Sequence, residues 1–293
     1  VIPDRSLWYL PFSVILDSED RPFGMERLVS LIPSADMLKF VRASGAKTKN
    51  AGFNGELLLF ESIPWIAEED VKESSGGHAG RKKVAPKITE EERIEQLILT
   101  NPVYPKPSEI VVTIQKIFRK FDVWVGPAAT MDRFREYKDR ADDVAVVAVP
   151  LAVTDGVSPD RQPCLFFSPD KKGRRQMGIR DLFSMPLGSR LAIVPVSWFD
   201  VPDKESAVGE GPLLFSVALI YAGVRMGMLN YSDPNWGSDE PFLLSILKKA
   251  AQKATASQAL GAYTKEIPAG LDASFSGRPP AWTGWILTGD PGS

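Results

Sequence analysis

The chain has 293 residues, of which 44% are apolar and 25% charged, and 35 basic residues nearly balance 37 acidic ones to give a formal net charge of −2. These values are typical of a globular protein and exclude a fibrous or wholly disordered chain. The near-neutral charge gives no support to nucleic-acid or anionic-membrane binding. The longest apolar run, residues 144–153, is shorter than the ~18–20 residues that a membrane-spanning helix needs. We expect one domain over residues 1–293.

The two rarest residue types limit the chemistry further. Because Cys164 is the single cysteine and His78 the single histidine, an internal disulfide and a Cys/His zinc site are both excluded. Any Ser–His or Cys–His catalytic unit would have to use His78. No metal or other cofactor is expected. The low cysteine content fits a reducing compartment, so a cytoplasmic location is predicted.

Short apolar runs and helical patterns alternate in the first part of the chain. Residues 28–32 and 56–60 are typical of short strands, and Ser34 is a good N-cap for a helix between them. The residues of this helix that are expected to face inward are Met37, Leu38 and Val41. Further helices are predicted over residues 89–100 and 110–121. Between the second strand and these helices, residues 68–87 are acidic, then rich in Gly and Ser, then basic, which predicts a mobile surface loop.

The second part of the chain indicates an α/β fold. The predicted strands are residues 122–125, 144–149, 165–167, 191–196, 226–230 and 282–287, and the predicted helices are 130–140, 212–226, 241–251 and a short one from Ser257. Continuous apolar runs such as 144–149 and 191–196 are typical of parallel strands buried on both faces. The alternation therefore predicts a doubly wound, mostly parallel sheet flanked by helices. In the helix 212–226, the residues expected to be buried are Leu213, Leu214, Val217, Ala218 and Tyr221.

Several stretches stand out in chain order: IPDRSLWYLPF at 2–12 with IPSA at 32–35, GPAAT at 126–130, GEG at 209–211 with A-x-x-YAGV at 218–224, and WTGWILTGDP at 282–291. Taken together they resemble the CHAT family, caspase-like peptidase domains often found after tetratricopeptide repeats. The resemblance spans nearly the whole chain and implies a caspase-like version of the doubly wound fold. It also implies that residues 1–293 are the C-terminal part of a longer protein.

Members of that family are expected to use a His–Cys dyad at the carboxyl ends of two neighbouring strands, where open α/β sheets place their sites. Aligning the strand 144–149 with the family's histidine strand puts Val149 at the histidine position. Aligning 191–196 with the cysteine strand puts Ser197 at the cysteine position, followed by Trp198, Phe199 and Asp200. Proline at 150 and 195 removes ladder donors, which indicates that both strand ends are rebuilt.

Several candidate residues keep two interpretations. In one interpretation His78 is a catalytic base on a mobile loop, and in the other it is an ordinary solvated loop residue. In the same way, Cys164 is either a relocated nucleophile or a buried thiol at a strand end. Ser197 is a nucleophile helped by Asp200 or an inert hydroxyl, because a serine without a base is a poor nucleophile. Glu210, within Gly209–Gly211, belongs to an anion cradle at a helix start or to a tight turn. Trp198 and Phe199 form a binding surface or plug the candidate cleft.

Two basic clusters also have two interpretations. Residues 81–83 (RKK) have acidic neighbours on both sides, so a solvated loop is expected. Lys171–Lys172 with Arg174–Arg175 is predicted to form a hairpin tip, either as a partner contact or as ordinary exposed turn charges.

The leading hypothesis is a CHAT-like pseudo-peptidase without a catalytic dyad, which acts as a protein-binding or regulatory module in a larger chain or complex. Its candidate binding residues are Ser197, Trp198, Phe199, Asp200 and Glu210. A repeat domain in the same or another chain is the expected kind of partner. The alternative is a hydrolase with Ser197 or Cys164 as a non-standard nucleophile, and a small-ligand sensor is a third possibility.

Overall fold

The structure is a computed structural model of residues 1–293. It describes residues 1–3, 7, 12, 15, 17–19, 29–45, 56–61, 113–137, 144–148, 151–153, 164–194, 197–199, 210–230, 240–252, 258 and 285–290. Their strands are β1 (Ser30–Leu31), β2 (Glu56–Glu61), β3 (Lys120–Val125), β4 (Val144–Ala148), β5 (Leu151–Val153), β6 (Cys164–Phe166), β7 (Gln176–Gly178), β8 (Leu191–Val194), β9 (Ser197–Phe199), β10 (Met226–Asn230) and β11 (Trp285–Gly289). Their helices are α2 (Ala35–Gly45), η4 (Gly126–Ala128), α6 (Met131–Arg135), α7 (Ile179–Phe183), α8 (Glu210–Tyr221) and α9 (Glu240–Ala251). Residues 113–117 are also helical.

A mixed seven-stranded sheet in the order β1-β11-β10-β8-β4-β2-β3 forms the centre of the molecule. The five strands from β10 to β3 run parallel, β11 is antiparallel to β10, and β1 is parallel to β11. The strand order reverses between β2 and β4, because the chain first adds β3 on one side of β2 and then β4 on the other. Such a reversal is the switch point at which open α/β sheets place ligands. The α/β class and the flanking helices are confirmed.

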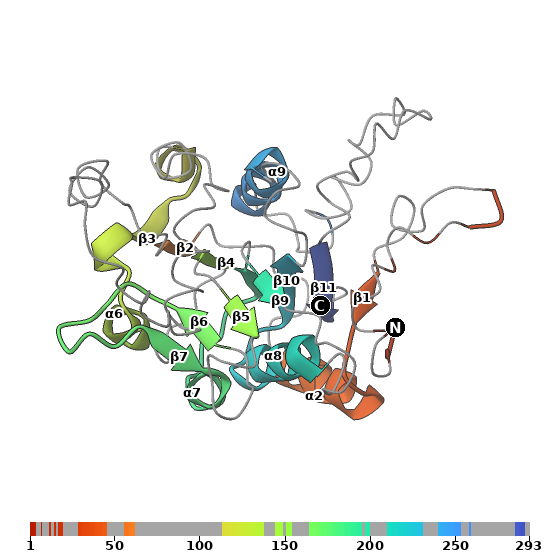
Figure 1. Ribbon diagram of the computed structural model, residues 1–293. Helices are drawn as coiled ribbons and strands as arrows, with labels where there is room; N and C mark the ends of the chain where they lie inside the picture. The colour runs from red at the N-terminus through yellow and green to blue at the C-terminus, as the bar shows by residue number, and fades with distance from the viewer. Residues whose placement is uncertain are drawn as a thin grey trace, which may run out of the picture.

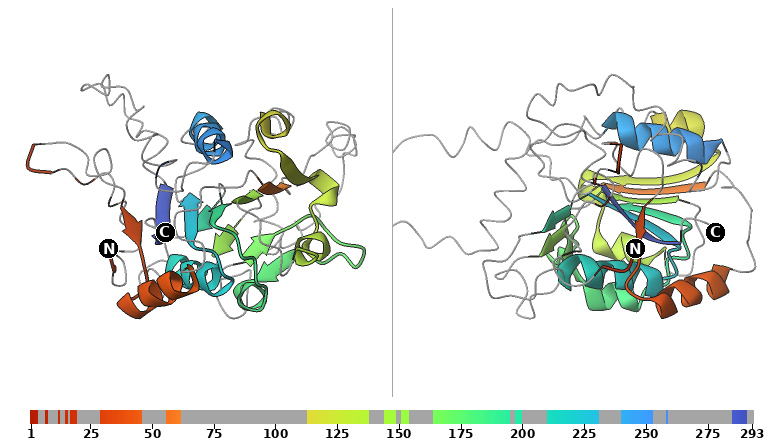
Figure 2. Two further views of the ribbon diagram at one scale, coloured as in Figure 1. Left: turned by 180° about the vertical axis from the view of Figure 1, so that it is seen from behind. Right: turned by 90° about the vertical axis from the view of Figure 1, so that its right-hand side faces the viewer.

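Helices cover both faces of this sheet (Figures 1 and 2). In β8, Leu191 and Ile193 pack with helix 113–117 and α9 on one face. Ala192 and Val194 pack on the other face in a cluster that also includes residues of α6, α7 and α8. This alternation follows the two-residue period of a strand with both faces buried.

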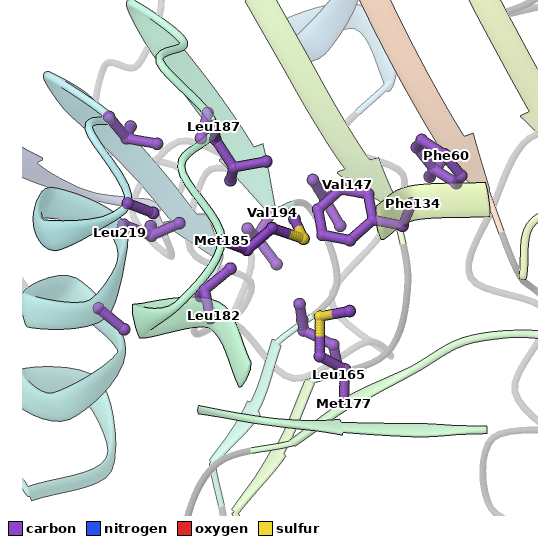
Figure 3. Close-up of a cluster of buried hydrophobic side chains, with 14 of the residues drawn as sticks. Phe60, Phe134, Val147, Leu165, Met177, Leu182, Met185, Leu187, Val194 and Leu219 are labelled. Atoms are coloured by element: carbon purple, nitrogen blue, oxygen red, sulfur yellow. The ribbon is translucent and has the colours of Figure 1, made fainter. Parts of the chain in front are cut away.

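The second cluster extends beyond the large sheet. Leu165 and Met177, from a smaller four-stranded sheet in the order β7-β6-β5-β9, share it with side chains of the large sheet (Figure 3). Phe134 of α6 is fully buried and meets the ring of Phe60 edge-to-face, with ring centroids 5.0 Å apart. Burial of several aromatic rings in one cluster fixes the small sheet and α6 against the large sheet.

The strand predicted over 144–149 is found as β4, whereas the longer apolar run 144–153 that contains it divides between two sheets. Residues 144–148 form β4 in the large sheet, and residues 151–153 form β5 in the small one. The run 191–199 divides in the same way into β8 and β9. Each change of sheet occurs at a link that contains a proline, Pro150 or Pro195.

The predicted cap and inward face of helix α2 are confirmed. The Ser34 hydroxyl accepts a hydrogen bond from the backbone N–H of Met37 at 3.1 Å, as expected for the cap of α2. Met37, Leu38 and Val41 pack against Ile220 of α8, which confirms their inward orientation. The predicted loop 68–87, the helix 89–100 and the short helix from Ser257 lie outside the described residues, apart from Gln258.

Two predictions that involve aromatic residues are wrong. Phe121 belongs to β3 rather than to the preceding helix, because residues 120–125 pair with β2 from Glu56 to Glu61. Tyr221 is 55% exposed, because α8 turns Ala218 and Leu219 toward the sheet and leaves Tyr221 on the outer side. There its ring contacts Phe40 and Phe183, with centroids 5.7 and 5.6 Å away.

The closing GDP motif occupies the amino-terminal edge of the parallel strands. Gly289 has a φ of +100° and lies against the carbonyl oxygen of Arg225. That carbonyl accepts the backbone N–H of Asp290 at 3.1 Å. The Asp290 carboxylate is 5% exposed and accepts a hydrogen bond from Arg42 Nε of α2 at 3.0 Å. The motif therefore joins α2, β10 and β11.

Among the helices of the described ranges, none is both long enough and apolar enough to cross a bilayer.

Candidate functional site

The two strands that the sequence singles out lie side by side. β4 and β8 run parallel, with Val144 opposite Leu191 and Val146 opposite Ile193, so their carboxyl ends meet at one edge of the large sheet. α8 crosses over from the β8 side to β10 and ends at the amino edge, where the carbonyl of Ala222 accepts the N–H of Leu187 at 2.6 Å. Helix α8 therefore begins, at Glu210, on the same edge as the carboxyl ends of β4 and β8.

Both strands continue past this edge, and their pairing changes register there. Partners in β4 and β8 differ by 47 in residue number (144 and 191), whereas partners in β5 and β9 differ by 46 (151 and 197). One additional residue is therefore inserted on the β4 side between the two sheets. This offset arises between the last described pair of β4 and β8 and the first pair of β5 and β9, which is the level where the sequence alignment places the two dyad positions.

The predicted dyad positions fall in this transition. Val149 lies outside the described residues, and Ser197 is the first residue of β9, opposite Leu151 of β5. Trp198 and Phe199 complete β9, which is an edge strand of the small sheet in the described part of the chain. Asp200 lies outside the described residues. The structure thus brings Ser197, Trp198 and Phe199 to the carboxyl edge as one short strand.

Cys164 is a buried thiol rather than an accessible nucleophile. It is 4% exposed in β6, opposite Ala152 of β5, which in turn lies opposite Trp198. Two strand spacings of about 4.8 Å separate Cys164 from β9. Burial, and secondarily the negative charge of Asp181, raises the pKa of the Cys164 thiol to about 11. Reactive cysteines have a lowered pKa, so this thiol has the opposite electrostatic environment.

The remaining candidate residues are placed only in part. Glu210 and Gly211 belong to the first turn of α8 rather than to a turn that precedes it, whereas Gly209 lies outside the described residues. His78 also lies outside them. The described residues contain no group of three or more His, Cys, Asp or Glu side chains that could hold a metal ion.

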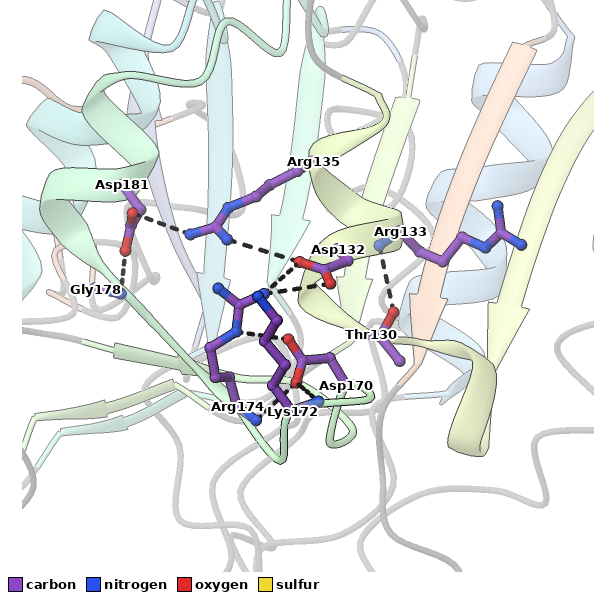
Figure 4. A network of polar contacts seen from close by, with 9 residues as sticks. All are labelled: Thr130, Asp132, Arg133, Arg135, Asp170, Lys172, Arg174, Gly178 and Asp181. Atoms are coloured by element: carbon purple, nitrogen blue, oxygen red, sulfur yellow. Dashed lines mark hydrogen bonds and ion pairs between the residues drawn. The ribbon is translucent and has the colours of Figure 1, made fainter.

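A chain of ion pairs that was not expected from the sequence lies beside the small sheet (Figure 4). Asp181 of α7 contacts Arg135 of α6 at 3.1 Å, and Arg135 also approaches Asp132 at 3.8 Å. Arg174, in the turn between β6 and β7, contacts Asp132 at 3.0 Å and Asp170 at 2.7 Å. Only the Asp170–Arg174 spacing of four residues around a glycine hints at this network in the sequence, because the other contacts join distant segments.

Neither a scan against models of known protein families nor a search of curated proteins found a match for this chain.

Proposed function

We propose that this chain is a caspase-like domain of the CHAT type that has lost its His–Cys dyad and acts, without catalysis, as a protein-binding or regulatory module of a larger chain or complex. The observation that carries the proposal is the placement of β4 and β8. They are adjacent parallel strands, as a dyad would require, yet the residues aligned with the dyad are Val149 and Ser197.

The chemistry of the described residues supports a non-catalytic function. A general base and a nucleophile cooperate, so the loss of both removes most of the rate advantage at once. The single cysteine is buried and holds its proton more tightly than a free thiol does. A serine hydroxyl at position 197 needs an imidazole or amine within hydrogen-bond reach to become nucleophilic.

The position of β9 suggests how a partner binds. An edge strand presents unpaired N–H and C=O groups, to which an extended peptide can add as a further strand. In the described residues β9 has a neighbour on one side only, β5. We propose that Ser197, Trp198 and Phe199 provide this edge; Asp200 follows them in the sequence, and Glu210 begins α8 on the carboxyl side of the large sheet.

The alternative is a hydrolase that uses Ser197 or Cys164. The test is an incubation of the purified chain with a broad library of quenched fluorescent peptides, with Ser197→Ala and Cys164→Ala variants in parallel. We expect no turnover above the rate of the two variants. Turnover that disappears in either variant would establish the hydrolase and remove the proposal.

The expected kind of partner is a repeat domain, which the resemblance to the CHAT family implies. The test starts from the sequence of the full-length protein, in which any repeat segment is identified. That segment is then expressed separately, and its binding to residues 1–293 is measured. We expect such a segment to bind the domain, and substitution of Trp198 and Phe199 by Ser to weaken that binding. A segment that binds both forms equally would place the partner elsewhere.

A further inference from the structure

The turn between β6 and β7 is a basic projection on the far side of the small sheet from β9. Because the sheet order is β7-β6-β5-β9, this turn and β9 belong to opposite edges. Residues 170–175 (DKKGRR) hold four basic residues and one acidic residue, a net charge of +3 in a chain whose total is −2. This concentration of charge is independent of what binds at β9.

The turn is held in one conformation from inside. The Asp170 carboxylate accepts hydrogen bonds from the backbone N–H groups of Lys172 and Arg174, each at 2.8 Å, and from Arg174 Nε at 2.7 Å. Gly173 takes a φ of +75°, and its N–H donates to the Asp170 carbonyl at 2.9 Å. Aspartate at the start and glycine at a left-handed position are the residues that such a turn requires.

The electrostatics of Asp170 agree with this geometry. Partial burial opposes ionisation of its carboxyl group, but the hydrogen bonds from Arg174 and Lys172 outweigh that effect and lower its pKa below the ordinary value. The carboxylate is therefore ionised and fully engaged at neutral pH.

Arg174 connects the turn to the body of the molecule. Its guanidinium contacts both Asp170 and Asp132 of α6, so the acidic groups nearest to the turn are already paired with an arginine (Figure 4). Lys171 and Lys172 are both exposed, and in the described part of the chain neither ammonium group forms an ion pair with a carboxylate. Their charges are displayed on a turn that is already ordered.

We propose that this turn is a docking element for an acidic segment of a partner protein, with Lys171 and Lys172 as the contacting groups. Complementary charge on an ordered element favours fast and orientation-specific encounter, and prior ordering reduces the entropy that binding costs. Nucleic acid fits less well, because high affinity for it uses many phosphate contacts and aromatic stacking. Residues 168–176 contain no aromatic side chain that could stack on a base.

The test measures the fluorescence anisotropy of a labelled octaglutamate peptide with the full chain, at low and at physiological ionic strength. The probe should bind more weakly as salt is raised, since exposed charges are screened. Lys171→Gln with Lys172→Gln should weaken binding about fivefold, because each exposed ion pair contributes little. The matched control is Lys116→Gln with Lys248→Gln, two exposed lysines on the opposite helical layer, which should bind like the parent.

A third variant, Asp170→Asn, separates an ordered docking element from plain charge attraction. This change makes the turn more positive but weakens its internal hydrogen bonds, so we expect weaker binding although the positive charge increases. Tighter binding would contradict the proposal. Equal effects of the two lysine pairs would also overturn it, as would preferential binding of an octathymidylate oligonucleotide. Each variant is first checked for an unchanged melting temperature, and octaserine serves as the uncharged peptide control.

Discussion

Substitution of Gly289 by alanine tests whether the GDP motif is a structural element, as its position indicates. Gly289 is the last residue of β11, opposite Met226 of β10. Its φ of +100° is one that residues with a side chain rarely adopt, and an added Cβ would overlap the carbonyl oxygen of Arg225. That oxygen cannot move freely, because it accepts the N–H of Asp290.

Three costs contribute to the expected loss of stability. The left-handed backbone costs an L-residue roughly 1–2 kcal/mol. Displacement of the Arg225 peptide group resembles the overpacking of a core, which costs roughly 1–3 kcal/mol. Loss of the hydrogen bond to Arg225 adds about 1 kcal/mol. We therefore expect Gly289→Ala to lower the free energy of unfolding by about 3–5 kcal/mol, with the three costs overlapping in part.

The assay is urea unfolding followed by tryptophan fluorescence, with Gly173→Ala as the matched control. Gly173 also has a positive φ, +75°, but an added Cβ there would meet no atom within 4 Å. The control should lose only the conformational cost, roughly 1–2 kcal/mol. If both variants lost the same stability, the close approach of β11 to Arg225 would not be the reason that glycine occupies position 289.

Two further predictions concern buried side chains. The raised pKa of the Cys164 thiol, about 11, should make its alkylation at pH 8 about 100-fold slower in the folded chain than in urea. Similar alkylation rates in both states would contradict this. Because the folded pKa exceeds the unfolded one, the contribution of this thiol to stability is complete below pH 9 and is lost as the pH rises through 11. Phe134→Ala should lower the free energy of unfolding by roughly 3–5 kcal/mol, because the ring is fully buried against Phe60 and Phe167. The control Phe121→Ala removes a ring that is 38% exposed and should lower the free energy of unfolding much less. Equal losses in the two variants would show that burial of the Phe134 ring is not the cause.

Much of the large sheet could be predicted because its signals are local. Continuous apolar runs such as 191–194 identify strands that are buried on both faces, and Ser34 marks the start of α2 through a hydrogen bond within four residues. The division of 144–153 between two sheets could not be predicted in this way. It depends on pairing with β8 on one side of Pro150 and with β9 on the other, and both partners are more than 40 residues away.

The candidate site was predictable as a location but not as an arrangement. Aligning two strand ends places Ser197 near the carboxyl edge, and β4 and β8 are indeed neighbours. The one-residue change of register and the role of β9 as an edge strand arise from tertiary pairing. The burial of Tyr221 was mispredicted for a related reason, since helical spacing defines a face but not which side of that face meets the sheet.

We expect no activated nucleophile at the carboxyl edge, and covalent labelling by electrophilic probes tests this directly. The folded chain, Ser197→Ala and Cys164→Ala are incubated with a fluorophosphonate and with an acyloxymethyl ketone probe, and labelling is read by intact mass. We expect no labelling of Ser197, and slower labelling of Cys164 in the folded chain than in the unfolded chain. Labelling of either residue that is faster in the folded chain would contradict this expectation.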